Sequence, residues 1–205
     1  MMEFWNSLLT EKSWRILQEL NKKYNFILIG GWATYLWTKQ QKSKDIDIVI
    51  DIEELQKLKN ESLSKNNKLN KYEIKIEEID VDIYVAHFSK LALPAEELKK
   101  YASKIEGFNV AKSEVLLILK QGAEIDRGYS PKGEKDRIDI MSLLFFTDFD
   151  SKNYSSILKK YKLEDYIAKL ISLVSNYQDY SSLGLTPREF KLKKKDILRE
   201  LREHN

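Results

Sequence analysis

The stretch FILIGGWATYLWTKQQKSKDIDIVIDI, residues 26–52, determines how the rest of the chain is interpreted. It begins with a short apolar run, Phe26 to Ile29, that stops at Gly30-Gly31. Such a run predicts a buried strand, and the two glycines predict a tight turn after it. Residues 32–41 carry apolar side chains at helical spacing, so we expect a short helix there.

A second predicted strand follows this helix, over residues 45–50, where Asp45-Ile46-Asp47-Ile48 alternates polar and apolar residues. Alternate side chains of a strand lie on the same face, so Asp45 and Asp47 are expected to point the same way. Two carboxylates on one half-buried face repel each other unless a cation neutralises them, and carboxylate oxygens are ligands that Mg²⁺ prefers. The pattern therefore predicts a site for Mg²⁺ or Mn²⁺.

Asp80 and Asp82 offer a third carboxylate from the predicted strand over residues 79–85. They share a face, but only one of them can lie level with the acidic pair of the earlier strand. We prefer Asp82, because the apolar residues 83–85 follow it, as expected on a central strand. The other interpretation is that both aspartates are solvated on an edge strand.

The composition is that of a globular protein: 205 residues, 42% hydrophobic and 11% aromatic. There is no cysteine and there are only two histidines, which excludes disulfides and disfavours a zinc site. The formal charge of +3 permits a nucleic-acid partner without arguing for one. No apolar run has the length of a membrane span and the first residues lack a signal-peptide core, so we expect a cytoplasmic protein with no membrane partner.

The pattern of apolar residues changes at Pro94, and this change predicts the domain organisation. Before it, strand patterns dominate, and a surface helix is expected over residues 53–65. Beyond it, the apolar pattern is mostly helical and glycine is confined to connections, with residues 107–111 as a small strand or loop. We therefore expect an α/β domain over residues 1–93 and a helical region over residues 94–205 that packs on it and completes a cleft.

The order strand, Gly-Gly turn, helix and Asp-x-Asp strand resembles the nucleotidyltransferase superfamily with the polymerase-β-like fold. Gly30-Gly31 and Asp45-Ile46-Asp47-Ile48 fill its motif with thirteen residues between them, and Gly31 stands where many members have serine. The resemblance implies an α+β fold, in which a mixed-sheet domain precedes a helical C-terminal region. It also implies that Gly30 and Gly31 bind the triphosphate of an NTP at a helix N-terminus.

The segments VLLILKQGAEIDR (115–127) and GEKDRIDIMSLL (133–144) resemble the AbiEii-type toxin and minimal nucleotidyltransferase group. The positions that match this group are Lys120, Ala123, Arg127, Lys135, Asp136 and Asp139, together with Ser43-Lys44-Asp45 for its Ser/Thr-x-Asp motif. The resemblance implies that Lys120 contacts nucleotide phosphates and that Asp136 is a further functional carboxylate, whereas Asp139 instead fixes the loop. Lys120 interrupts an apolar helix, so it either meets an anionic partner or extends its ammonium to the helix edge.

Together with these patterns, the resemblance implies a Mg²⁺-dependent transfer of a nucleoside monophosphate from an NTP to an acceptor. The expected catalytic residues are Asp45, Asp47, Asp82, Lys120 and Asp136; the expected metal ligands are Asp45, Asp47 and Asp82; and the expected nucleotide contacts are Gly30, Gly31, Ser43 and Lys120. Two other functions stay open, namely transfer to a small molecule such as an aminoglycoside and a catalytically inactive nucleotide-binding or interaction module.

The acceptor is expected to be an RNA 3′ end such as that of tRNA. Characterised relatives of the toxin-like group modify RNA ends, and the group also implies a cognate antitoxin as partner. In addition, the predicted helix over residues 187–203 concentrates basic side chains, including Lys193, Lys194 and Lys195. A cationic outer face on such a helix would guide a phosphate backbone.

Overall fold

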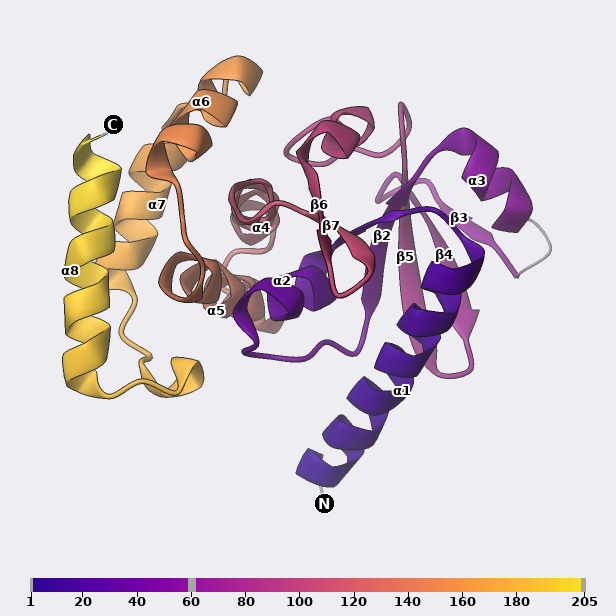
Figure 1. The fold of residues 1–205 in the computed structure, drawn as a ribbon, viewed down its shortest axis with the longest axis horizontal. Helices are drawn as coiled ribbons and strands as arrows, with labels where there is room; N and C mark the ends of the chain where they lie inside the picture. Colours follow the sequence, from indigo (N-terminus) through magenta and orange to yellow (C-terminus); the bar gives the residue numbers. More distant parts are fainter. Residues whose placement is uncertain (1, 59–61, 204–205) are drawn as a thin grey trace. The chain divides into compact units, whose positions relative to one another are not determined.

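The computed structural model describes residues 2–58 and 62–203 (Figure 1). The chain divides into two compact units, Met1–Lys112 and Ser113–Asn205. The first unit holds the strands and the second is helical. The predicted α+β class, a mixed sheet followed by a helical C-terminal region, is confirmed.

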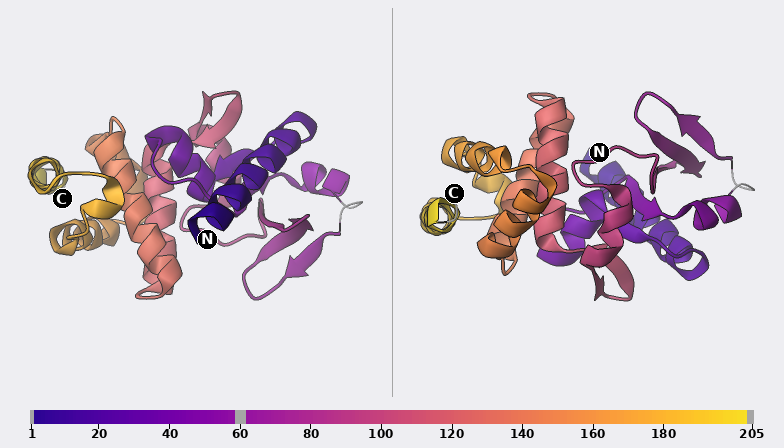
Figure 2. Two further views of the ribbon diagram at one scale, coloured as in Figure 1. Left: turned by 90° about the horizontal axis from the view of Figure 1, so that it is seen from below. Right: turned by 90° about the horizontal axis from the view of Figure 1, so that it is seen from above.

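The first unit is built on a seven-stranded sheet with the order β3-β4-β5-β2-β1-β7-β6. Its elements are α1 (Met2–Lys23), β1 (Ile27–Ile29), α2 (Gly30–Thr38), β2 (Ile46–Ile50), α3 (Ile52–Lys57), β3 (Ser64–Asn66), β4 (Lys71–Ile76), β5 (Ile79–Val85), the 3₁₀ helix η2 (Ala95–Tyr101), β6 (Ala102–Ile105) and β7 (Phe108–Ala111). The sheet is mixed, because β2 runs antiparallel to β1 but parallel to β5. Seen from below, α1 and α2 lie across the sheet (Figure 2).

Strand β5 shows how the sequence creates two faces. Ile79, Val81 and Ile83 point into the core and are at most 2% exposed, whereas Asp80 and Asp82 alternate with them on the other face. Burial of the apolar face contributes about 25 cal/mol for each Å² removed from water. Because a slip of one residue would bury the aspartates instead, this alternation fixes which face carries the acids.

The two compact units divide after Lys112, whereas the sequence pattern placed a boundary after residue 93. The difference arises because β6 and β7 belong to the sheet. Strand β7 pairs in parallel with β1, with Leu28 and Val110 as Cα partners, and β6 pairs with β7. Each of these strands has only four residues, which is too short for its periodicity to stand out beside the helical pattern that follows.

The helix expected over residues 53–65 is wrong in its second half. Helix α3 ends at Lys57, residues 59–61 lie outside the described part of the chain, and Ser64–Asn66 form β3. Strand β3 pairs antiparallel with β4, with Ser64 opposite Glu73. Pairing with a neighbouring strand therefore overrides the helical propensity of a Lys-rich segment.

The second unit consists of helices joined by short connections. They are α4 (Ser113–Arg127), α5 (Pro131–Phe146), α6 (Ser151–Tyr161), α7 (Asp165–Asn176), the 3₁₀ helix η3 (Ser181–Leu183) and α8 (Pro187–Glu203). Local chemistry sets several helix starts: the Ser130 hydroxyl accepts from the Gly133 N–H before α5, and Asp150 accepts from two N–H groups of α6. No helix in the described ranges is long and apolar enough to cross a membrane.

Candidate functional site

The turn after β1 is packed against Asp47. Gly30 has a φ of +68°, and a Cβ on it would lie only 2.1 Å from Oδ2 of Asp47. Antiparallel pairing produces this proximity, because Ile29 and Asp47 are Cα partners across β1 and β2. A side chain at position 30 would therefore be strained and would displace the carboxylate.

Helix α2 begins at this same turn. Its N-cap residue, Ile29, provides no side-chain hydrogen bond to the first N–H groups, and Gly31 in the first turn is buried. The N-terminus of a helix carries a partial positive charge and exposed N–H donors, which favour a phosphate group. The turn thus places a helix end that favours an anion beside a carboxylate that favours a cation.

The acidic side chains line up across three neighbouring strands. Asp47 of β2 is the Cα partner of Asp82 of β5, and Asp82 is the Cα partner of Glu73 of β4. Paired residues of adjacent strands point to the same face, so these three carboxylates share one face of the sheet. Asp45 lies just before β2 and is exposed. Burial raises the pKa of Asp82, the contact with Lys71 opposes this rise, and the negative charges of Glu73 and Asp45 add to it.

Asp80 does not belong to this line. It lies opposite Lys75, its side chain is 63% exposed, and it forms a long ion pair of 3.6 Å with the Lys75 ammonium. Asp82, by contrast, is level with Asp47 and its side chain is 23% exposed. The geometry therefore separates two aspartates that are only two residues apart in sequence.

A lysine that sequence reasoning did not select lies among these acids. The ammonium of Lys71 is 2.5 Å from Oδ2 of Asp82 and 3.1 Å from Oε1 of Glu73. Burial would lower the pKa of Lys71, but the contacts with Asp82 and Glu73 outweigh it and raise the pKa, so the side chain stays charged. The single ammonium of Lys71 thus bridges two carboxylates that face each other across β4 and β5.

The register of the hairpin, counted from the Glu77-Glu78 turn, predicts the contacts of this lysine. In a hairpin closed by two residues, Glu73 must lie opposite Asp82, and such a like-charge pair needs a nearby cation. Lys71 lies one diagonal step away on the same face.

The donor set of this face fits Mg²⁺ or Mn²⁺, because it consists of carboxylate oxygens. Within residues 2–58 and 62–203, however, no three Asp, Glu, His or Cys side chains are grouped closely enough to hold a metal ion as they stand. One oxygen of Asp82 contacts Lys71 instead. Asp45 and Asp47 are the other two predicted ligands. Ser43, a predicted nucleotide contact, is only 2% exposed and lies inside the unit.

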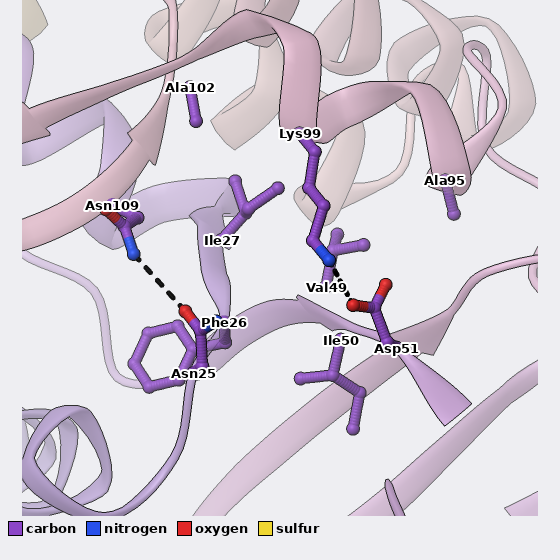
Figure 3. A pocket seen from close by; sticks show the side chains of 10 residues that line it. All are labelled: Asn25, Phe26, Ile27, Val49, Ile50, Asp51, Ala95, Lys99, Ala102 and Asn109. Atoms are coloured by element: carbon purple, nitrogen blue, oxygen red, sulfur yellow. Dashed lines mark hydrogen bonds and ion pairs between the residues drawn. The ribbon is translucent and has the colours of Figure 1, made fainter. Parts of the chain in front are cut away.

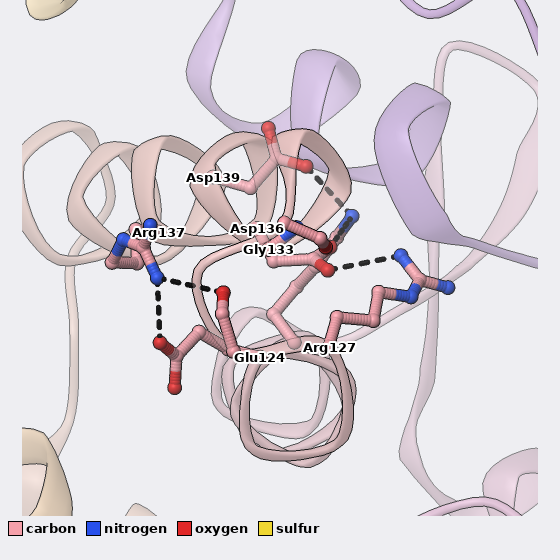
Figure 4. A network of polar contacts seen from close by, with 9 residues as sticks. Glu124, Arg127, Gly133, Asp136, Arg137 and Asp139 are labelled. Atoms are coloured by element: carbon pink, nitrogen blue, oxygen red, sulfur yellow. Dashed lines mark hydrogen bonds and ion pairs between the residues drawn. The ribbon is translucent and has the colours of Figure 1, made fainter.

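The predicted residues of the second unit form a buried charge network between α4 and α5 (Figure 4). The ammonium of Lys120 is 2.6 Å from Oδ2 of Asp139 and 3.2 Å from Oδ1 of Asp136. Arg127, two turns along α4, donates to Oδ2 of Asp136 at 2.9 Å. The side chains of Asp136 and Asp139 are 2% and 3% exposed. The anionic partner that Lys120 requires is thus supplied by α5.

Two lysines of the basic C-terminal helix point inward. Lys193 donates to the carbonyl oxygen of Phe145 at the end of α5, and Lys194 donates to the carbonyl oxygens of Ser175 and Tyr177 at the end of α7. They satisfy helix C-termini, which attract cations. The basic residues of α8 that are exposed are Arg188, Lys191, Lys195, Arg199 and Arg202.

A pocket of about 240 Å³ lies elsewhere in the first unit (Figure 3). It is lined by the start of β1 and the end of β2, which is the other end of these strands from Gly30 and Asp47. Lys99 and Asp51 form an ion pair on one side of it, and the amides of Asn25 and Asn109 meet on the other. The pocket is therefore separate from the acidic face.

Comparison with known proteins identifies the fold. No protein-family model matches the chain, and no curated protein matches it. Among solved structures, JHP933 from Helicobacter pylori is 20% identical, with 97% of this chain and 94% of that chain covered and a TM-score of 0.52. A candidate nucleotidyltransferase from H. pylori is 19% identical, with 98% of each chain covered and a TM-score of 0.54. The fold is of the nucleotidyltransferase type.

Proposed function

We propose that the protein transfers a nucleoside monophosphate from an NTP to an acceptor hydroxyl, with pyrophosphate as the leaving group. One observation carries the proposal: the Gly30 turn and the start of α2 pack against Asp47, which is level with Asp82. A phosphate-binding helix end next to carboxylates is the arrangement that this chemistry needs. The nucleotidyltransferase-type fold supports it.

Different residues of the first unit would bind the triphosphate, hold the metal ion and accept the proton. The N–H groups at Gly30 and Gly31 would bind the triphosphate, and Asp45 and Asp47 would hold Mg²⁺ or Mn²⁺. When bound, the ion would offset phosphate charge and orient the reacting group. Asp82, with its pKa raised chiefly by burial, would accept the proton of the acceptor hydroxyl.

The second unit supports a structural role for Lys120 and Asp136. Their charges are matched inside the unit, since Lys120 and Arg127 face Asp136 and Asp139. We therefore propose that Lys120 fixes α4 against α5, and that phosphate contact by Lys120 is the competing role to be tested.

The finer proposal is an RNA 3′ end as acceptor, for a cytoplasmic protein of the AbiEii-type group with a cognate antitoxin as partner. Support comes from the exposed basic residues of α8, since cationic side chains on one helix suit a phosphate backbone. The residues to change are Lys191, Lys195 and Arg199, because Lys193 and Lys194 serve the helix ends. Changing these three residues to Glu should weaken RNA binding and leave NTP affinity unchanged.

Incubation with each NTP labelled at the α-phosphate, together with Mg²⁺ and total RNA, tests the proposal. Label should enter RNA, and the Asp47→Asn variant should incorporate at least about a hundredfold less, because it loses a metal ligand. Label that enters only an added pool of aminoglycosides would establish the small-molecule acceptor. NTP binding without label transfer to any acceptor would establish the inactive nucleotide-binding module.

A further inference from the structure

The Lys71 ammonium lies where a cation is required. Glu73 and Asp82 are directly opposite each other on adjacent antiparallel strands, a position at which two like charges destabilise a sheet. Lys71 contacts both carboxylates, at 3.1 Å and 2.5 Å, and is itself only 8% exposed. The ion pair to Asp82 therefore belongs to the architecture of the sheet.

This ammonium also adjoins the acidic face described above. Asp82 is the Cα partner of Asp47, so the cation of Lys71 lies one strand away from the candidate metal ligand. A lysine ammonium is a compact point charge, and that of Lys71 contacts Oδ2 of Asp82, a carboxylate oxygen of the kind that Mg²⁺ or Mn²⁺ binds. A divalent ion placed next to the ammonium would be repelled by it.

We propose that Lys71 replaces one divalent cation, so that the acidic face binds one metal ion fewer than its carboxylates would otherwise hold. The inference rests on the proposed function in that Asp45 and Asp47 are taken as ligands of the remaining ion. Without the lysine, Asp82 and Glu73 would be left facing each other and would recruit a second ion between them.

The test counts Mn²⁺ ions bound per chain, with no nucleotide present, from the loss of the free Mn²⁺ signal in electron paramagnetic resonance. Lys71→Met should bind one ion more than the unchanged protein, and the double variant Lys71→Met with Asp82→Asn should lose that extra ion. Lys71→Arg keeps the charge, so its count should stay at the original value. A purely structural role of Lys71 would change thermal stability and leave the ion count alone.

Lys75→Met is the matched control. Lys75 lies on the same strand, two positions on from Glu73, and its partner Asp80 lies on the same strand and face as Asp82. Both side chains of that pair are more than 60% exposed, so its removal should not create an ion site. Circular dichroism of each variant verifies that the sheet is intact before ions are counted.

The same ion count in Lys71→Met and in the unchanged protein would overturn the inference. So would an extra ion that appears equally in Lys75→Met. Counting needs no catalysis, so the outcome is independent of whether any acceptor is labelled. If the unchanged protein binds no ion and Lys71→Met binds one, the inference about Lys71 holds while the proposed ion at Asp45 and Asp47 fails.

Discussion

Replacement of Lys120 by Met tests whether the buried network of the second unit is structural. The change keeps most of the side-chain volume and removes the charge. Asp139 loses the ammonium at 2.6 Å, and Asp136 keeps its ion pair with Arg127, whose own side chain is 44% exposed. Removing one partner of a buried ion pair costs about 3–5 kcal/mol, because a charge remains in a medium that solvates it poorly. That is a large share of the roughly 5–15 kcal/mol that stabilises a typical protein.

Two spectroscopic probes separate the effects on the two units during urea unfolding. All four tryptophans lie before residue 38, so their fluorescence reports on the first unit, whereas far-ultraviolet circular dichroism includes every helix of the second. Lys120→Met should lower the midpoint of the dichroism transition more than that of fluorescence. The control is Lys169→Met, which breaks an exposed pair with Asp165 and should cost about 0.5 kcal/mol or less.

A second change makes the reasoning refutable. If the cost comes from uncompensated charge, adding Asp139→Asn to Lys120→Met should recover at least about half of the loss, because a neutral amide is cheaper to bury than a carboxylate. A loss below about 1 kcal/mol in Lys120→Met, accompanied by weaker NTP binding, would contradict the structural role. In that case Lys120 contacts phosphate, as the family resemblance implies.

Further predictions concern the turn, the metal and the helical core. Gly30→Ala should abolish NTP binding, whereas Gly107→Ala, also at positive φ but with nothing within 4 Å of a Cβ, should cost only about 1–2 kcal/mol of backbone strain; calorimetry and thermal melting measure both. Asp47→Ala should remove the difference in ATP affinity between Mg²⁺ and EDTA, and equal affinities in the unchanged protein would refute metal dependence. Tyr154→Phe should cost about 1–3 kcal/mol, because the buried Gln121 carbonyl oxygen loses its donor at 2.5 Å. Burial raises the pKa of Tyr154 above its ordinary value of 10.0. The folded protein therefore favours the neutral phenol, so the stabilisation from Tyr154 is present below pH 10 and should be lost as the pH rises above 10. Thermal melting across this pH range measures the loss.

The motif-bearing strands and the major helices were predictable from local patterns. The short apolar run before Gly30 is typical of a buried strand, and the alternation through Asp47 is typical of a strand with two different faces. Both strands are present. The apolar residues of α4 and α5 likewise specify helices. A signal of this kind needs no knowledge of distant partners, which is why single-sequence reasoning finds it.

Strands defined by their neighbours were harder to predict. Strand β3 and strand β6 have three and four residues and lie at the two edges of the sheet, so little burial marks them. The partner of Lys120 is another such case: the need for an anion was visible, but Asp139 is nineteen residues away and meets Lys120 only when two helices pack. Lys71 was overlooked because cross-strand register decides its contacts.

The place of β1 in the sheet has a consequence for the synthesis of the chain. In the sheet, this three-residue strand lies between β2 and β7. Its antiparallel partner β2 follows soon after it in the sequence, whereas its parallel partner β7 is synthesised about eighty residues later. Until residue 111 is available, one edge of Ile27–Ile29 has no partner, although all three side chains are apolar and destined for burial. A fragment that ends at residue 93 keeps the Gly30 turn and the carboxylates of the acidic face. It lacks β7, however, so the central strand β1 becomes an exposed edge, which promotes aggregation. A fragment that ends at Lys112 retains the complete sheet.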